Sequence, residues 1–187
     1  MDSKNIQIGM INVVIGGAML WFLIVQRNLN IDTVFYWLAT GTFIVHWYWG
    51  LVAYVRYIGA TEELGEFCLD IIAVGLQVST IFWINSPVTW FILNGLSFSL
   101  AIAKYLLSLK TRKLPHRLVE YIKEKTRLHS LGVIGMFAGA IIAICFQPQW
   151  LLGLITLVVH ILVMYYLIIK KVYVLHEPGK EQKEESF

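Results

Sequence analysis

The chain has 187 residues, of which 58% are hydrophobic and 14% are charged, with a net charge of +3 and a mean hydropathy of +0.67. Soluble domains carry about 25% charged residues, so this composition excludes an ordinary soluble domain and indicates an integral membrane protein. The lipid bilayer is therefore the first expected partner, and no nucleic-acid partner is expected.

Apolar segments recur along the chain at lengths near the roughly 20 residues that a helix needs to cross about 30 Å of hydrocarbon. We predict an all-α, polytopic membrane protein with six transmembrane helices, over residues 8–25, 33–58, 67–84, 88–109, 131–146 and 150–172. We expect the first segment to be retained, because its apolar core is too long for a secretory signal and no small-residue cleavage site follows. The connections at 26–32, 85–87 and 147–149 are short, which predicts three antiparallel helical hairpins.

Lysine and arginine residues are distributed unevenly among the expected loops. Seven of them lie between the fourth and fifth spans: Lys110, Arg112, Lys113, Arg117, Lys123, Lys125 and Arg127. Short loops this basic stay in the cytoplasm. With this loop inside, both termini are inside as well, and Arg27 alone of the 15 basic residues falls outside. We therefore expect a cell-membrane protein with cytoplasmic termini.

The basic segment 110–129 is expected to form an amphipathic helix on the inner membrane surface. Four apolar residues share one side of this helix: Leu114, Leu118, Tyr121 and Ile122. Such a helix would contact anionic lipid, and Pro115 suits its first turn. The alternative is a solvated linker that only sets the topology. Residues 1–174 then form one membrane domain, followed by a polar cytoplasmic tail at 175–187.

The third and fourth spans contain few polar residues, and these repeat at helical spacing. If the two spans are antiparallel helices folded about Pro87, residues equally distant from it face each other. Four pairs result: Asp70 with Lys104, Gln77 with Ser97, Thr80 with Asn94, and Glu66 with Ser108. Because an unpartnered polar group is costly in hydrocarbon, we interpret these residues as one internal polar seam between the two spans.

Two histidines are expected at the depth of this polar seam. His46 shares a face with small residues of the second span, which is typical of close helix packing, and His160 lies near the middle of the sixth span. We predict a midplane group of His46, Gln77, Asn94 and His160 that serves a proton or solute pathway. The structural alternative gives each residue one interhelical hydrogen bond, worth roughly 0.6 to 2 kcal/mol. A two-histidine haem or metal site is disfavoured, and we expect no cofactor and no metal.

The charged residues of the polar seam have a plain alternative as well. Lys104 would snorkel to the interface if it did not pair with Asp70. Arg56, at the inner end of the second span, is expected to join Asp70 and Lys104 or to reach Glu63 or Glu66. Intramembrane ionisable groups are functional candidates by default, so we include Arg56 among the residues of the predicted solute pathway.

Signatures of catalysis are scarce. We find no paired-carboxylate metal motif, nucleophile elbow, phosphate-binding glycine loop or HExxH. Six spans, Cys68 at the start of the third span and Pro115 in a basic loop resemble the layout of the membrane peptidases that process quorum-sensing peptides. That family has a histidine shortly before its cysteine, where this chain has residues 61–63, Thr-Glu-Glu, so no catalytic residue is carried over. The remaining cysteine, Cys145, lies at the opposite depth, and no disulfide is expected.

Two functions are compatible with these features. In the favoured one, the polar seam binds or transports an ion or small solute, and the short hairpins resemble in layout the substrate-binding subunits of vitamin importers. In the other, the protein is a non-catalytic interaction or regulatory protein that acts through its cytoplasmic loops and basic helix. A groove of small residues, Gly132, Gly135, Gly139 and Ala143, allows close packing within the chain, in a homo-oligomer or against a partner membrane protein.

Overall fold

The computed structural model describes residues 3–25, 30–58 and 64–169. Over these residues it is entirely helical, as predicted. The elements are α1 (Ser3–Val25), α2 (Ile31–Tyr57), α3 (Leu64–Ser79), the 3₁₀ helix η1 (Thr80–Trp83), α4 (Pro87–Thr111), α5 (His116–Cys145) and α6 (Gln149–Ile169). The predicted tail at 175–187 lies outside the described residues.

Five helical segments of the described chain are long and apolar enough to cross a membrane. They are Asn5–Ile24, Leu64–Trp83, Pro87–Thr111, His116–Cys145 and Gln149–Leu167. The helix outside this set is α2, which is long enough at 27 residues but contains many tryptophans, tyrosines and threonines and a histidine. The coarse expectation of a membrane-type helical protein is thus supported, whereas α2 differs from the other helices in composition.

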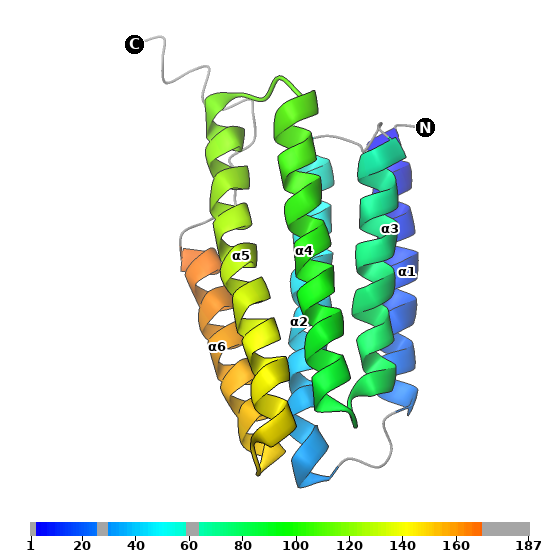
Figure 1. Cartoon of the computed structure of the whole chain (residues 1–187). Coiled ribbons are helices and arrows are strands. Elements are labelled where there is room, and N and C mark those ends of the chain that lie inside the picture. The colour runs from blue at the N-terminus through cyan, green and yellow to red at the C-terminus, as the bar shows by residue number, and fades with distance from the viewer. Residues whose placement is uncertain (1–2, 26–29, 59–63, 170–187) are drawn as a thin grey trace.

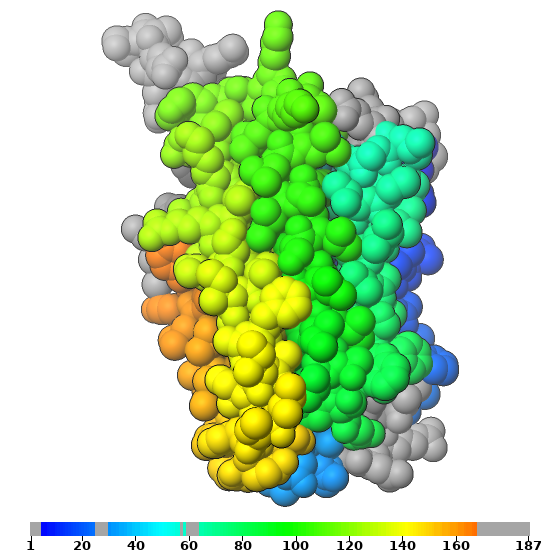
Figure 2. Space-filling model, viewed as in Figure 1, coloured from blue at the N-terminus to red at the C-terminus, as the bar shows by residue number. Residues whose placement is uncertain are grey.

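The helices form two layers of three. In Figure 1, α3, α4 and α5 lie side by side in front, with α4 in the middle, and α1, α2 and α6 lie behind them. Within the front layer α4 packs against both α3 and α5, and within the rear layer α2 packs against both α1 and α6. Successive helices run in opposite directions, and Figure 2 shows α4 filling the space between α3 and α5. Both central helices, α2 and α4, therefore face the interior.

Large aromatic side chains fill the space between the two layers. Tyr36 and Phe43 of α2 meet Trp90 of α4 at ring-centroid distances of 5.2 and 5.7 Å. The Trp90 indole Nε1 donates a hydrogen bond to Thr40 Oγ1 at 2.8 Å, so its buried N–H is satisfied. These rings thus fill the interior between α2 and α4.

Glycines allow the helices of the front layer to approach closely. A Cβ on Gly139 of α5 would lie 2.5 Å from Cε1 of Phe91 on α4, and one on Gly132 would lie 3.3 Å from the Phe98 ring. A Cβ on Gly135 would meet nothing within 4 Å. The groove of small residues predicted from sequence is thus used inside the chain, and Gly135 is the member that faces away from α4.

The structure differs from the prediction in the basic segment. We expected a surface helix at 110–129 and a separate span beginning at 131, but His116–Cys145 is one helix of 30 residues. Buried residues of α5 continue along a single face with alternating steps of three and four: Ile122, Lys125, His129, Met136, Gly139 and Ala143, with Gly132 completing the series. This heptad spacing is typical of a helix with one continuous packing face, and so the first turns of α5 belong to the bundle.

Candidate functional site

Asp70 and Lys104 form the ion pair that the sequence predicted. Lys104 Nζ lies 2.6 Å from Asp70 Oδ2, and the side chains are 20% exposed for Asp70 and 5% for Lys104. Side chains of a helix tilt toward its N-terminus, so Lys104 extends from α4 toward the middle of the bundle rather than outward along α4. Its Nζ also lies 3.6 Å from the centroid of the Tyr54 ring. Lys104 therefore pairs inside the protein and does not snorkel.

Closer to the turn, two of the predicted polar pairs are wrong. Gln77 Nε2 donates to Asn94 Oδ1 at 3.1 Å, whereas Ser97 donates to the Ala73 carbonyl at 3.0 Å. Thr80 donates to the carbonyl of Gln77 within its own segment. The turn ends at Ser86, and Pro87 already begins α4, so the helices fold about an earlier point than the predicted Pro87. The pair of Asp70 and Lys104 still forms because the long lysine side chain spans the offset.

A second ion pair closes the end of the bundle where α4 joins α5. Arg112 holds Glu66 through both oxygens, with Nη2 to Oε2 at 2.7 Å and Nε to Oε1 at 3.2 Å. The Tyr54 hydroxyl donates to Glu66 Oε2 and is also hydrogen-bonded to Ser108. The predicted partners Glu66 and Ser108 are thus joined through Tyr54, which was not among the residues of the predicted seam.

Arg112 takes the place that the sequence predicted for Arg56 beside Glu66, whereas Glu63, the other predicted partner of Arg56, lies outside the described residues. Arg56 is exposed on α2, and the ion pairs of Glu66 and Asp70 are made by Arg112 and Lys104. The basic residues near the predicted inner boundary are many, and sequence alone does not indicate which of them turns inward.

The two predicted histidines are part of a larger group, which we call the histidine cluster: His46 of α2, Lys125 and His129 of α5, and His160 of α6. All four side chains are buried. The ring of His46 lies 5.2 Å from that of His160 and 5.9 Å from that of His129. Lys125 Nζ lies 3.4 Å from His46 Nε2, and His129 Nδ1 is hydrogen-bonded to the Lys125 carbonyl at 2.7 Å. Gln77 and Asn94 are also buried, but their hydrogen bond belongs to the interface of α3 and α4.

Lys125 and His129 were not predicted as site residues because the sequence pattern placed them on a surface helix. A signal for them was present, since both fall on the heptad face that runs through Gly132 and Gly139. Extending this face backward by seven residues from Gly139 gives Gly132 and then Lys125. The same step from Met136 gives His129.

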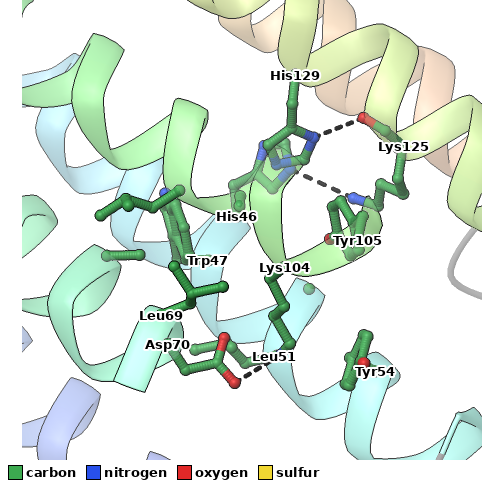
Figure 3. A pocket seen from close by; sticks show the side chains of 14 residues that line it. His46, Trp47, Leu51, Tyr54, Leu69, Asp70, Lys104, Tyr105, Lys125 and His129 are labelled. Carbon is green, nitrogen blue, oxygen red and sulfur yellow. Dashed lines mark hydrogen bonds and ion pairs between the residues drawn. The ribbon is translucent and has the colours of Figure 1, made fainter. Parts of the chain in front are cut away.

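A small cavity joins the ion pair to the histidine cluster. The cavity has a volume of about 20 Å³. This is enough for one water molecule, which needs roughly 10 to 15 Å³. Polar groups around it come from four helices: His46, Tyr54, Asp70, Lys104, Tyr105, Lys125 and His129. Figure 3 shows Asp70 and Lys104 at one end of this cavity and His46, His129 and Lys125 at the other.

Beyond His160 the interior becomes aromatic. The Phe43 ring lies 4.1 Å from the His160 ring and 5.7 Å from both the Trp90 and the Phe98 rings. Phe43 and Trp90 are completely or almost completely buried. Among the described residues, the charged and imidazole side chains of the interior thus extend from Arg112 to His160 and stop at a layer of packed rings.

The fold and the site together define a class: a bundle of apolar, span-length helices, compatible with an integral membrane protein, whose interior holds charged and imidazole side chains. Comparison with known proteins gives no more particular identity, since no family model, curated protein or solved structure matches the chain. In the described part of the chain, no three His, Cys, Asp or Glu side chains are placed to hold a metal ion. Cys68 and Cys145 are free and exposed. The chemistry that this arrangement offers is ion pairing, hydrogen bonding and proton exchange.

Proposed function

We propose that the protein crosses the cell membrane six times, in three hairpins with both termini in the cytoplasm, and that it binds or transports a small ion or solute through its interior. The observation that carries this proposal is the cavity between the pair of Asp70 and Lys104 and the histidine cluster. In this topology α2 also crosses the membrane. Its polar and aromatic residues suit a helix enclosed between α1, α6 and α4.

The interior contains more ionisable side chains than stability alone requires, among them Glu66, Lys104 and Lys125. Burial of a charge is costly even when it is paired, and replacing a buried ion pair by apolar residues of similar size is often neutral or stabilising. A bundle that needed only stability would be served by leucine or methionine at these positions. Polar side chains that surround a cavity inside a membrane protein are typical of a pathway for an ion or solute.

The dimensions of the cavity limit what it can hold. A volume of about 20 Å³ accommodates a water molecule or a small ion, whereas drug-sized ligands occupy pockets of roughly 300 to 1,000 Å³. The aromatic layer around Phe43 and Trp90 separates the cavity from the end of the bundle where α2 begins. Passage across the whole protein would therefore require these rings to move.

The test uses currents from protein-containing vesicles on a solid-supported membrane, with protons and small inorganic ions offered one at a time. We expect wild-type protein to give a current with at least one of them and Asp70→Asn to abolish it, because the amide leaves Lys104 without its countercharge. Asp32→Asn is the matched control, since Asp32 is exposed in the first turn of α2. Unchanged currents in Asp70→Asn and His46→Ala would show that the polar seam is structural, and absence of any wild-type current would refute the proposed function.

A further inference from the structure

Resting on the proposed function, we propose that the histidine cluster binds a proton and exchanges it with Asp70 through the cavity, so that the proton is the ion that this protein carries. The proposal joins the predicted residues His46 and His160 to Lys125 and His129 of α5, which were not predicted as site residues. It depends on three observations: the contact between Lys125 and His46, the close approach of the three imidazoles, and the water-sized space between them and Asp70.

The contact between Lys125 and His46 joins two bases that can share one proton. Lys125 Nζ is 3.4 Å from His46 Nε2. An ammonium can only donate a hydrogen bond, so with Lys125 charged the His46 Nε2 must accept. If the proton moves along this contact, Lys125 becomes a neutral amine and His46 an imidazolium, and the total charge is unchanged. Both side chains are more than nine-tenths buried, which keeps bulk water away from this exchange.

The other two imidazoles extend the cluster from the cavity to the aromatic layer. His129 lies beside His46 and lines the cavity. His160 is stacked on His46 at an interplanar angle of 25°, is 6% exposed, and has no hydrogen-bond partner at Nε2 among the described residues. A buried nitrogen without a partner costs about 1 to 3 kcal/mol. The cost is understandable if this nitrogen receives a proton during the transport cycle.

Asp70 lies on the other side of the cavity, where its carboxylate can accept the proton. A water molecule between His46 and Asp70 would accept a proton from the imidazolium and donate one to the carboxylate, leaving neutral His46, neutral Asp70 and the water unchanged. Loss of the Asp70 charge removes the partner of Lys104, 2.6 Å away. Proton arrival would thus be coupled to release of the ion pair between α3 and α4.

Every helix that packs around the cavity contributes a titratable group. The cavity that His46 lines is also lined by Asp70 of α3, Lys104 and Tyr105 of α4, Lys125 and His129 of α5, and Tyr54 of α2, and His160 of α6 stacks on His46. The cavity is lined by more basic side chains than acidic ones, so its charge disfavours a metal cation. Its small volume excludes organic solutes. A small inorganic anion is the competing solute, and the experiment is designed to separate it from the proton.

The experiment uses full-length protein in liposomes that contain a fluorescent pH indicator, with a potassium gradient and valinomycin as the driving force. We expect wild-type protein to acidify the lumen, and Lys125→Met or His46→Gln to slow this flux by about tenfold or more, since a positioned proton-transfer group contributes at least that much. Lys123→Met is the control, because Lys123 is exposed and pairs only with Glu120 among the described ion pairs. Chloride flux is measured in parallel with a chloride-sensitive dye. Flux of chloride or another ion without protons would overturn the proton assignment and leave the proposed function intact, whereas absence of every flux would overturn both.

A second measurement does not depend on transport. In bicelles, ¹⁵N NMR of histidine-labelled protein reports the protonation of each imidazole as the pH is changed. We expect the titration of His46 to change in Lys125→Met and in Asp70→Asn, and to remain as in wild type in Lys123→Met. If His46, His129 and His160 keep one protonation state at every pH at which the protein is folded, the cluster does not exchange protons and the inference is wrong.

Discussion

At the scale of single residues, the ion pairs of Asp70 with Lys104 and of Glu66 with Arg112, inside the bundle, differ from a pair on its surface. Glu66 is fully buried and is held by Arg112 and Tyr54. Lys123 and Glu120 form a pair of similar length at 2.9 Å, but their side chains are 60% and 53% exposed. Exposed pairs contribute little because water screens them, while removal of one partner of a buried pair leaves an uncompensated charge.

This difference can be measured directly. We expect Arg112→Met to lower the free energy of unfolding by about 3 kcal/mol, because the Glu66 carboxylate stays buried without its guanidinium. Adding Glu66→Gln should recover most of the loss. Lys123→Met should leave the stability unchanged. Denaturant unfolding in bicelles, followed by circular dichroism, provides the comparison, and equal effects of Arg112→Met and Lys123→Met would contradict this account of the buried pair.

At the scale of elements, α4 and α5 pack together where aromatic rings of α4 lie against glycines of α5. Phe91 lies over Gly139, and the Phe98 ring lies against Gly132. Without side chains at these positions the helix backbones approach closely, and packing of this kind is a main source of helix association in membranes. The same face carries Lys125 and His129, so close packing of α4 and α5 also positions half of the histidine cluster.

Alanine substitutions at two glycines of α5 should separate the effect of helix packing from the effect of helix propensity on stability. In Gly139→Ala the new Cβ would lie 2.5 Å from Phe91 Cε1, and the ring is too enclosed to move freely, so we expect a loss of about 1 to 3 kcal/mol. Gly135→Ala has the same chemistry on the same helix but open space around the Cβ, and alanine is the better helix former. It should be neutral or stabilising in the same unfolding assay. Similar losses in both variants would show that the close approach of α4 and α5 is unimportant.

At the scale of the whole molecule, the alternating helices place connections at two ends of the bundle (Figure 1). The basic connection between α4 and α5 lies at one end, and the short turns after η1 and after α5 lie at the other. If the bundle crosses the membrane as proposed, the basic end is cytoplasmic because positively charged loops are retained there. The polar interior then faces the cytoplasm and the aromatic layer lies toward the outside.

Cysteine labelling tests this orientation. In a background with Cys68→Ala and Cys145→Ala, we expect Asn85→Cys to react with a membrane-impermeant maleimide in intact cells, because Asn85 is exposed at the turn between η1 and α4. Lys113→Cys, exposed in the connection between α4 and α5, should react only after permeabilisation. The reverse pattern would invert the topology, and labelling of both positions in intact cells would refute a membrane-spanning hairpin of α3 and α4.

Much of this architecture follows from local patterns in the sequence. The boundaries of α4 were predicted to within a few residues because a short turn at 85–87 precedes the apolar segment and a basic run follows it. The pair of Asp70 and Lys104 was predictable because two oppositely charged residues at similar depth have few other partners in an apolar environment. The helix boundary expected before residue 131 was wrong. The many charged residues at 110–129 were given more weight than the heptad spacing that continues through them into the rest of α5.

The sequence by itself determined the helical, membrane-type composition and the inward position of Asp70, Lys104, His46 and His160, since these depend on hydropathy and helical spacing along one segment at a time. Only the tertiary structure decided that Arg112 rather than Arg56 holds Glu66, that Gln77 pairs with Asn94, and that Lys125 and His129 complete the histidine cluster. These choices depend on the rotation and offset of each helix against its neighbours. Such rotations and offsets are set by side-chain packing between different helices, which no single segment encodes.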